Sequence, residues 1–188
     1  MAVPDPRFIA AAVTQLREQE NHQLAAKFLY NLYSRELLTL AYRITDHLPL
    51  AEDMVQEVFI HSFAKIGQLK EPAHYGSWVK RILVNRCLRE KRTALVFLPL
   101  VAGDLSEGVF DDHKAWYEQI PFPVIHSAIQ KLPTGCRTVF TLHLMEGYKH
   151  REIADLLGIQ LSTSKSQYRY ALRRLREILS PQRDALHQ

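Results

Sequence analysis

The sequence predicts an all-α protein of two small helical domains joined by a linker, the C-terminal one a helix-turn-helix. Three observations support this fold class. Apolar residues recur at helical spacing along most of the 188-residue chain, and few segments alternate as strands do. The chain has only seven glycines and many Leu, Ala, Arg and Glu residues, which favour helices. Charge is also partitioned: residues 1–93 carry a net +3, residues 94–124 a net −4 and residues 125–188 a net +5.

The first 93 residues are predicted to form one domain of helices separated by turns. One apolar stripe at helical spacing runs from Phe28 to Ile44, and a second runs from Val55 to Ile66. A turn at His47-Leu48-Pro49 lies between them, and the stretch from Gly67 to Gly76 is a second break. A third helix follows, and the three stripes are expected to form the core.

Residues 94–124 are predicted to be an acidic linker. Prolines and glycines punctuate the segment, and it holds five acidic residues against one basic residue. Its five aromatic residues exclude a fully solvated tether. We expect them to dock on one of the two domains or on a partner.

Residues 125–188 are predicted to form the second domain. Two helical segments, roughly Val124–Lys131 and Cys136–Glu146, are ended by Pro133 and by Gly147. The remainder is typical of a helix-turn-helix.

The first helix of that pair has apolar residues at i, i+3 and i+4 from Ile153 to Leu157. Gly158 supplies the left-handed conformation that ends a helix, and Ser162 or Thr163 is expected to cap the next one. This second helix suits a DNA major groove, because it begins with short polar residues and carries cations along its length. Those cations are Lys165, Arg169, Arg173, Arg174 and Arg176. The alternative is an ordinary helical hairpin with a solvated basic face.

Several classes of protein are excluded by what the sequence lacks. Cys87 and Cys136 are far apart and form no CxxC pattern, which argues against zinc and disulfides and favours a reducing cytoplasm. No segment has the length of a membrane span, and the N-terminus lacks a signal-peptide pattern. No phosphate-binding loop, nucleophile–base set or metal-ligand cluster appears. We therefore expect that the protein is not an enzyme, that it binds no metal or cofactor, and that it does not insert into a membrane.

Two polar patches in the first domain are candidate binding surfaces. Asp53, Gln56 and Glu57 fall at i, i+3 and i+4, so they share one helix face that can bind arginines of a partner protein. A solvated helix face is the simpler interpretation of these three residues taken alone.

The second patch is the loop from Lys70 to Ser77 with the basic helix that follows it. A loop with rings and hydroxyls beside a cationic helix can grip single-stranded DNA, because rings receive unstacked bases while cations hold phosphates. Trp78 is expected to be a core anchor, whereas Tyr75 is equally consistent with a core anchor and with a DNA contact.

The order of these patches is more specific than any patch alone. The motifs are, in chain order, Asp53…Gln56-Glu57-Val58-Phe59, Tyr75-x-x-Trp78-x-x-x-Ile82-x-x-Asn85, Leu132-Pro133…Arg137-x-x-Phe140 and Glu146-Gly147-Tyr148…Leu157-Gly158-Ile159…Thr163-x-Lys165-Ser166. This arrangement resembles the extracytoplasmic-function (ECF) sigma factors of bacterial RNA polymerase. The resemblance covers region 2 at about residues 24–93 and region 4 at about residues 125–179.

The resemblance implies three sets of contacts. The set expected to bind the β′ clamp helices of core polymerase is Asp53, Gln56 and Glu57. The set expected to bind the −10 element of promoter DNA is Lys70, His74, Tyr75, Ser77, Lys80, Arg81, Asn85, Arg86 and Arg89. The set expected to bind the −35 element is Thr163, Lys165, Ser166, Arg169, Tyr170, Arg173 and Arg174. It also implies contact with the β flap, a linker that threads toward the polymerase active-site channel, and a possible anti-sigma factor.

The recognition helix departs from the usual family pattern. Gln167 stands where Arg is frequent, Tyr168 replaces an aliphatic residue, and Leu172 stands where Arg is common. The run from Ser164 to Gln167 resembles a Bacteroidetes-type branch of the family. These departures bear on the −35 sequence that is read. The competing interpretation of the whole chain is a stand-alone helix-turn-helix regulator that never binds polymerase.

Overall fold

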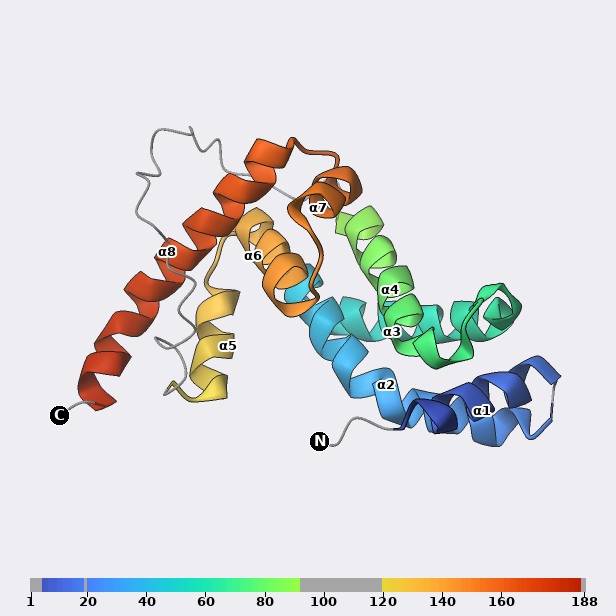
Figure 1. The fold of residues 1–188 in the computed structure, drawn as a ribbon. Helices are drawn as coiled ribbons and strands as arrows, with labels where there is room; N and C mark the ends of the chain where they lie inside the picture. Colours follow the sequence, from blue (N-terminus) through green and yellow to red (C-terminus); the bar gives the residue numbers. More distant parts are fainter. Residues whose placement is uncertain (1–4, 19, 92–119, 187–188) are drawn as a thin grey trace. The chain divides into compact units, whose positions relative to one another are not determined.

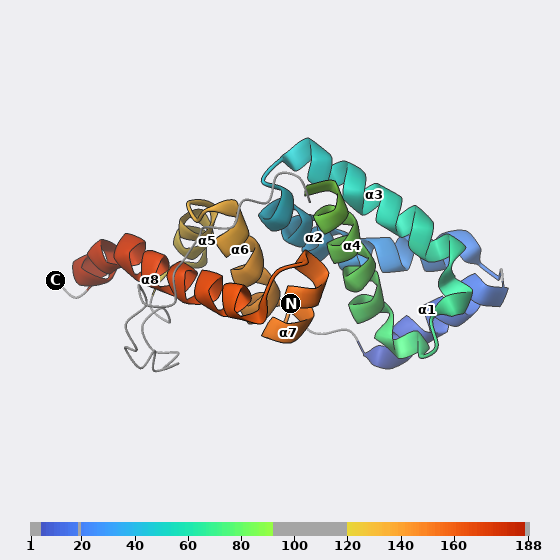
Figure 2. The same ribbon diagram turned by 90° about the horizontal axis from the view of Figure 1, so that it is seen from above.

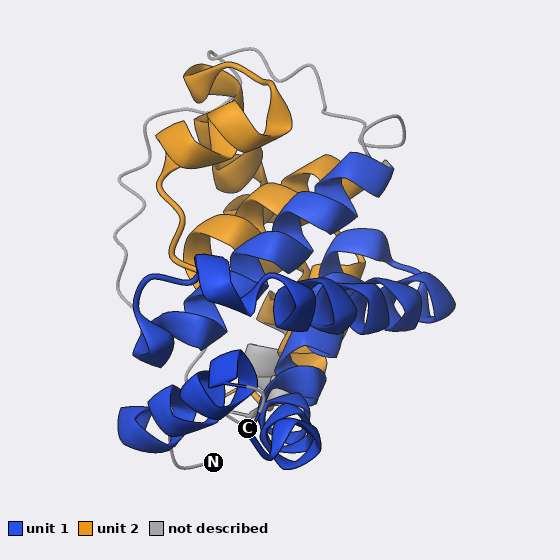
Figure 3. Ribbon diagram, turned by 90° about the vertical axis from the view of Figure 1, so that its right-hand side faces the viewer, with its two compact units in different colours: residues 1–91 blue, residues 92–188 orange. Residues whose placement is uncertain are grey.

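The computed structural model describes residues 5–18, 20–91 and 120–186, and it divides into two compact units, residues 1–91 and residues 92–188 (Figure 3). The described residues form helices and turns, with no strand among them. The predicted all-α fold class is confirmed. The predicted linker lies outside the described residues as far as residue 119, so its path stays a prediction.

The described residues of unit 1 form four α-helices and two short 3-10 helices (Figures 1 and 2). Their bounds are α1 Pro6–Glu18, α2 His22–Thr45, α3 Leu48–Ala64, η1 Ile66–Gln68, η2 Pro72–His74 and α4 Tyr75–Lys91. Helix α2 packs against α1, α3 and α4, and α3 packs against α4. Both 3-10 helices lie against α1.

The core of unit 1 follows the predicted apolar spacing, except that Phe28, the first residue of the predicted stripe, is 40% exposed. In α2, the side chains of Leu29, Leu37, Leu40 and Ile44 are fully buried. Burying one such aliphatic side chain stabilises a fold by about 1.5–3 kcal/mol. Helix α1 adds a second stripe at i, i+3, i+4 and i+7, made of Ile9, Ala12, Val13 and Leu16.

The turn between α2 and α3 is shorter than predicted. Helix α2 ends at Thr45, and Asp46 takes a left-handed conformation with φ 54°. His47 then caps α3, because its Nδ1 accepts a hydrogen bond from the backbone N–H of Leu50 (3.1 Å). Pro49 belongs to the first turn of α3, where a residue without an N–H costs nothing.

The described residues of unit 2, 120–186, form four α-helices and a π-helical turn (Figure 1). Their bounds are α5 Phe122–Gln130, α6 Thr134–Phe140, the π-helical turn η5 Thr141–Met145, α7 His150–Leu157 and α8 Leu161–Leu186. The break at Pro133 and the stop at Gly147 are as predicted, and Gly147 has φ 74°. The last turn of the predicted Cys136–Glu146 helix is widened into η5.

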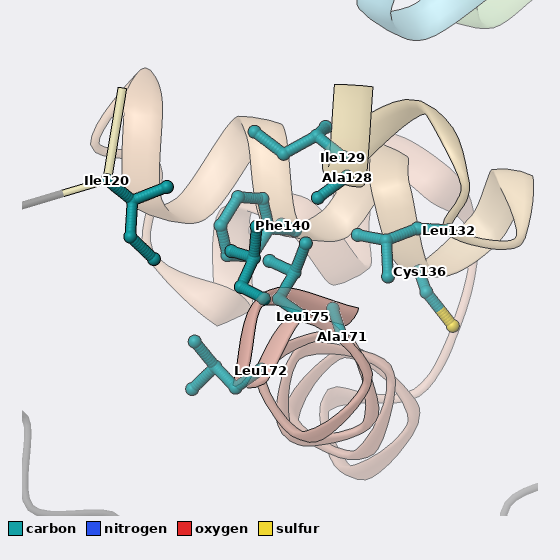
Figure 4. Packing of buried hydrophobic residues seen from close by; sticks show 10 residues of the cluster. Ile120, Ala128, Ile129, Leu132, Cys136, Phe140, Ala171, Leu172 and Leu175 are labelled. Carbon is teal, nitrogen blue, oxygen red and sulfur yellow. The ribbon is translucent and has the colours of Figure 1, made fainter. Parts of the chain in front are cut away.

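The core of unit 2 joins α5, α6 and α8. Figure 4 shows Ile129, Phe140 and Leu175 converging from the three helices, with Ala171 and Leu172 beside Leu175 on α8. Arg137 is buried at the α5–α6 turn, where its Nη1 donates to the backbone oxygen of Gln130 (2.9 Å). Helix α8 is therefore held on α5 and α6 through Ala171, Leu172, Leu175 and Leu179.

Within the described parts of the chain, no helix is long and apolar enough to cross a membrane. Those parts also contain no group of three or more His, Cys, Asp or Glu side chains placed to hold a metal ion.

Candidate nucleic-acid interface

The three polar residues of α3 lie together on its solvent-facing side. Asp53, Gln56 and Glu57 are all exposed, while Met54 and Val58 on the opposite side are buried. The core thus holds α3 in one rotation about its axis, and that rotation presents the three polar side chains outward. This geometry matches the helix face predicted from the sequence.

Helix α4 carries the cations predicted to face DNA. Arg81, Asn85 and Arg89 are exposed, while Lys80 and Arg86 are half-buried. Lys80 pairs with Glu36 of α2 at 2.5 Å, measured from Nζ to Oε1.

Arg86 pairs with Glu57 across the α3–α4 interface, and the distance from Nη2 to Oε2 is 2.5 Å. The sequence placed these two residues in separate binding sets, and the structure brings them into contact. Their pairing could not be read from the sequence, because it depends on how α3 and α4 pack.

A surface cavity of about 460 Å³ lies between α3 and α4, beside this ion pair. Its lining residues are Glu57, Val58, His61, Ile82, Asn85, Arg86 and Arg89. His61 was not predicted as a site residue. No sequence signal marked it, since it joins the cavity only through the packing of two helices.

The loop before α4 is partly as predicted. Lys70, His74 and Ser77 are exposed. The prediction that Tyr75 contacts DNA is wrong for this structure, because its side chain is fully buried. Its hydroxyl is hydrogen-bonded to that of Ser62 (2.9 Å) and its ring centroid lies 5.6 Å from that of Tyr33.

Burial raises the pKa of the Tyr75 phenol well above its usual value and is the largest cause of that shift. The hydroxyl therefore stays protonated. Tyr75 is therefore a core anchor of the loop, which is one of the two roles left open by the sequence. The next residue, Gly76, lies against the ring of Tyr33. A Cβ atom added at Gly76 would stand 2.7 Å from that ring.

The helix-turn-helix is formed by α7 and α8. Gly158 ends α7 with φ 65°, as predicted. Glu152 accepts a hydrogen bond from the backbone N–H of Lys149 (2.8 Å), which satisfies one donor at the start of α7. The predicted cap at Ser162 or Thr163 is wrong, because α8 begins at Leu161 and both residues belong to its first turn.

The predicted reading face of α8 is only partly turned to solvent, and its member Tyr170 packs against the core of unit 2. Lys165, Arg173 and Arg174 are exposed, and the half-buried members of the set are Thr163, Ser166, Arg169 and Tyr170. The Arg173 guanidinium lies 5.3 Å from the Tyr170 ring centroid. Arg174 pairs with Glu177 one turn further along the helix (2.8 Å).

Gln167, noted as a departure from the family pattern, is not on this face. It is fully buried and accepts a hydrogen bond from the Cys136 thiol (2.8 Å). The departure is therefore a change in the core that joins α6 to α8.

Two stacked histidines, absent from the predicted sets, connect η5, α7 and α8. The ring centroids of His143 and His150 are 4.0 Å apart, and the Tyr168 ring meets His143 edge-on at 4.7 Å. A hydrogen bond of 2.9 Å joins His150 Nδ1 to Ser164 Oγ. Sequence spacing gave no signal for this cluster, because its rings come from three elements.

The His150 cluster predicts a pH-dependent stability of unit 2. Burial, followed by the nearby charges of His143, Lys165 and Arg169, lowers the pKa of His150 from 6.5 to about 4. Because the folded-state pKa is the lower one, protonation favours the unfolded chain. The stabilisation is complete above pH 6.5 and is lost as the pH falls toward 4.

Thermal unfolding of the full chain between pH 7 and pH 4 measures this effect. We expect the melting temperature of unit 2 to fall across this range in the wild type and to fall less in His150→Asn. His22→Asn, on an exposed position of α2, is the control and should behave as the wild type. Equal pH dependence in His150→Asn and the wild type would contradict the assignment.

Comparison with known proteins identifies the family. Two family models match the chain, Sigma-70 region 2 over residues 29–94 and Sigma-70, region 4 over residues 124–175. The RNA polymerase sigma-H factor of Pseudomonas aeruginosa is 24% identical over 176 residues, covering 88% of this chain and 91% of that protein. The ECF RNA polymerase sigma factor SigW of Bacillus subtilis is 25% identical over 163 residues, covering 80% and 87%. The chain belongs to the sigma-70 family and is of the ECF type.

A solved structure agrees with the fold of this ECF sigma factor. The sigma factor RpoE of Bartonella quintana, crystallised in complex with the anti-sigma factor NepR, gives a TM-score of 0.52 at 24% identity. The match covers 82% of this chain and 96% of that chain. This likeness shows the fold, and the two family models with the curated relatives confirm the resemblance to ECF sigma factors. The placement in a Bacteroidetes-type branch stays a prediction. Helix α1 lies outside both family matches.

Proposed function

We propose that this ECF sigma factor is the promoter-specificity subunit of a bacterial RNA polymerase. Sigma factors are not enzymes, so nucleotidyl transfer belongs to the polymerase. The observation that carries the proposal is that regions 2 and 4 occur in one chain, each with residues of its predicted polar face exposed on a packed helical unit. Because this polymerase acts in the cytoplasm, the proposal includes a cytoplasmic location.

The proposed core polymerase contact is the exposed face of α3. Asp53, Gln56 and Glu57 offer acceptors to arginines of the β′ clamp helices, and charge-assisted hydrogen bonds are the stronger kind. Unit 2 is proposed to bind the β flap.

The proposed −10 contact combines the loop before α4 with α4 itself. Lys70, Arg81 and Arg89 are exposed cations that can hold phosphates, and Asn85 can hydrogen-bond a base edge. With Tyr75 in the core, the exposed ring of this loop is His74. Capture of unstacked bases offsets an unstacking cost of a few kcal/mol per step.

The proposed −35 contact is the partly exposed reading face of α8. Lys165, Ser166 and Arg169 lie in its N-terminal half, the part of a recognition helix that reaches base edges. Arg173 and Arg174 lie further along and are proposed to bind phosphate.

Replacing Lys165 or Arg169 with Ala is expected to weaken −35 binding by about 1–3 kcal/mol if each reads a base. Binding of holoenzyme to promoter duplexes with single base changes measures both affinity and selectivity. Arg176→Ala is a matched loss of charge on the same helix outside the proposed set. Unchanged base selectivity in Lys165→Ala and Arg169→Ala would remove these residues from the reading face.

Run-off transcription tests the proposed function directly. Purified full-length chain is added to core polymerase on a library of genomic promoters, and we expect initiation at specific start sites. A stand-alone helix-turn-helix regulator, the competing interpretation, would bind duplex DNA and leave core polymerase unchanged. A pull-down with core polymerase separates the two functions. Whether an anti-sigma factor controls this chain is a further part of the proposal.

A further inference from the structure

Helix α1 has no assigned role, although it packs beside the loop proposed to contact the −10 strand. Its buried stripe packs it against the rest of unit 1. It contacts α2, α4, η1, which precedes the loop, and η2, which lies within the loop. The region 2 match begins at residue 29, so α1 is an element that the family match does not account for.

Arg17, in the last turn of α1, holds the backbone of the loop. Its Nε donates to the carbonyl oxygen of Ile66 (3.4 Å), and its Nη2 donates to the carbonyl oxygen of Leu69. Ile66 is the first residue of η1, and Leu69 directly follows it. A guanidinium can hold two such acceptors at once because its N–H groups form a rigid fork. The side chains of Ile66 and Leu69 are themselves buried.

The loop is therefore fixed at both ends. On one side, Leu69 is buried and its carbonyl is held by Arg17. On the other side, Tyr75 is buried and hydrogen-bonded to Ser62. Between these anchors the chain exposes Lys70 and His74, the loop residues proposed to meet the −10 strand.

We propose that α1 braces this loop and that Arg17 is a positioning residue for −10 recognition, acting through the backbone of Ile66 and Leu69 without touching DNA. The inference rests on the proposed function. Holding the loop before DNA arrives removes an ordering cost that binding would otherwise include. Loss of the brace should weaken capture of the −10 strand while leaving polymerase docking on α3 intact.

The test compares full-length Arg17→Met, Arg17→Lys and wild type, each assembled with core polymerase. The probe is the single-stranded non-template −10 segment of a promoter that the wild-type holoenzyme transcribes. We expect Arg17→Met to weaken probe binding by about fivefold to tenfold, with core binding and −35 duplex binding unchanged. Arg17→Lys should lie between the two, because an ammonium can satisfy one carbonyl but not both in the fork geometry.

Arg7→Met is the matched control, since Arg7 lies on the same helix and pairs with Asp5 at the helix start. The salt dependence of binding separates positioning from direct contact. If Arg17 bound a phosphate, Arg17→Met would lower the slope of log affinity against log salt by about one, and Arg17→Lys would match the wild type. Either of those results would overturn the proposal.

Hydrogen exchange on the free full-length chain provides a readout that does not depend on DNA. We expect faster exchange at the amides of Lys70, Glu71, Ala73 and His74 in Arg17→Met, with exchange in α3 unchanged. Unchanged exchange in the loop would overturn the brace, as would equal probe affinity in all variants. A wild-type holoenzyme that transcribes no promoter would instead contradict the proposed function, whereas a transcribing holoenzyme that does not bind the probe would overturn the proposed role of the loop and its brace.

Discussion

Reversing the charge of Asp53 and Glu57 together, with Asp53→Lys and Glu57→Lys, is expected to abolish holoenzyme formation. Both side chains are exposed on the same face of α3, so the double variant presents two cations where acceptors for polymerase arginines are proposed. Helicity should be retained, because neither side chain is part of the core. Co-purification with core polymerase and far-ultraviolet circular dichroism measure the two effects.

The ion pair between Glu57 and Arg86 requires a specific control for this experiment. Glu57→Lys places a cation beside Arg86, so a loss of binding has two possible causes. The charge swap Glu57→Lys with Arg86→Glu restores the pair but not the acidic face. If Glu57 binds polymerase, the swap stays defective, whereas recovery of binding assigns the defect to α3–α4 packing.

Two further variants complete the design. Asp53→Lys alone leaves the Glu57–Arg86 pair intact and should weaken core binding by itself. Glu18→Lys with Glu20→Lys makes the same change in net charge on a different part of unit 1 and should bind normally. Because an exposed ion pair contributes about 0–1 kcal/mol, loss of the Glu57–Arg86 pair does not unfold the unit. Normal core binding by the Asp53→Lys, Glu57→Lys variant would refute the docking face.

The sequence predicted the helices and turns that depend on local patterns. Helical spacing located the stripe of α2, and Gly158 was correctly assigned to the end of α7 because φ 65° suits glycine. Local patterns were less informative where several residues compete for one role. Ser162 and Thr163 are both good caps, but α8 starts earlier, at Leu161, and the cap prediction failed.

Contacts between residues far apart in the chain could not be predicted from the sequence. The Glu57–Arg86 pair, the Arg17 contacts and the stacking of His143 on His150 each join separate elements. Spacing along the chain determines which residues share one helix face, but not which face of the next helix they meet. Tyr75 shows the same limit at a single residue, because an aromatic ring next to a loop fits either a base-binding surface or a core anchor.

Replacing Tyr75 with Ala is expected to destabilise unit 1 by about 3–5 kcal/mol, the cost of deleting a large buried aromatic side chain. Its ring lies 5.6 Å from the Tyr33 ring and 6.0 Å from the Trp78 ring, so Ala leaves a cavity that rigid neighbours cannot fill. Tyr75→Phe removes only the hydroxyl and should cost about 1 kcal/mol. That cost stays small because Ser62 still donates to the carbonyl of Phe59 (2.9 Å).

Urea unfolding of unit 1 and binding of the −10 strand by holoenzyme, measured on the same variants, separate the two roles of Tyr75. A core anchor predicts that Tyr75→Phe keeps near-normal DNA affinity and that Tyr75→Ala loses stability first. If Tyr75 instead stacks on a base, Tyr75→Ala should keep normal stability and bind the −10 strand weakly. Since the hydroxyl and the ring of Tyr75 both make contacts inside unit 1, we expect Tyr75→Ala to lose stability. The same substitution removes the contact that holds the C-terminal end of the loop.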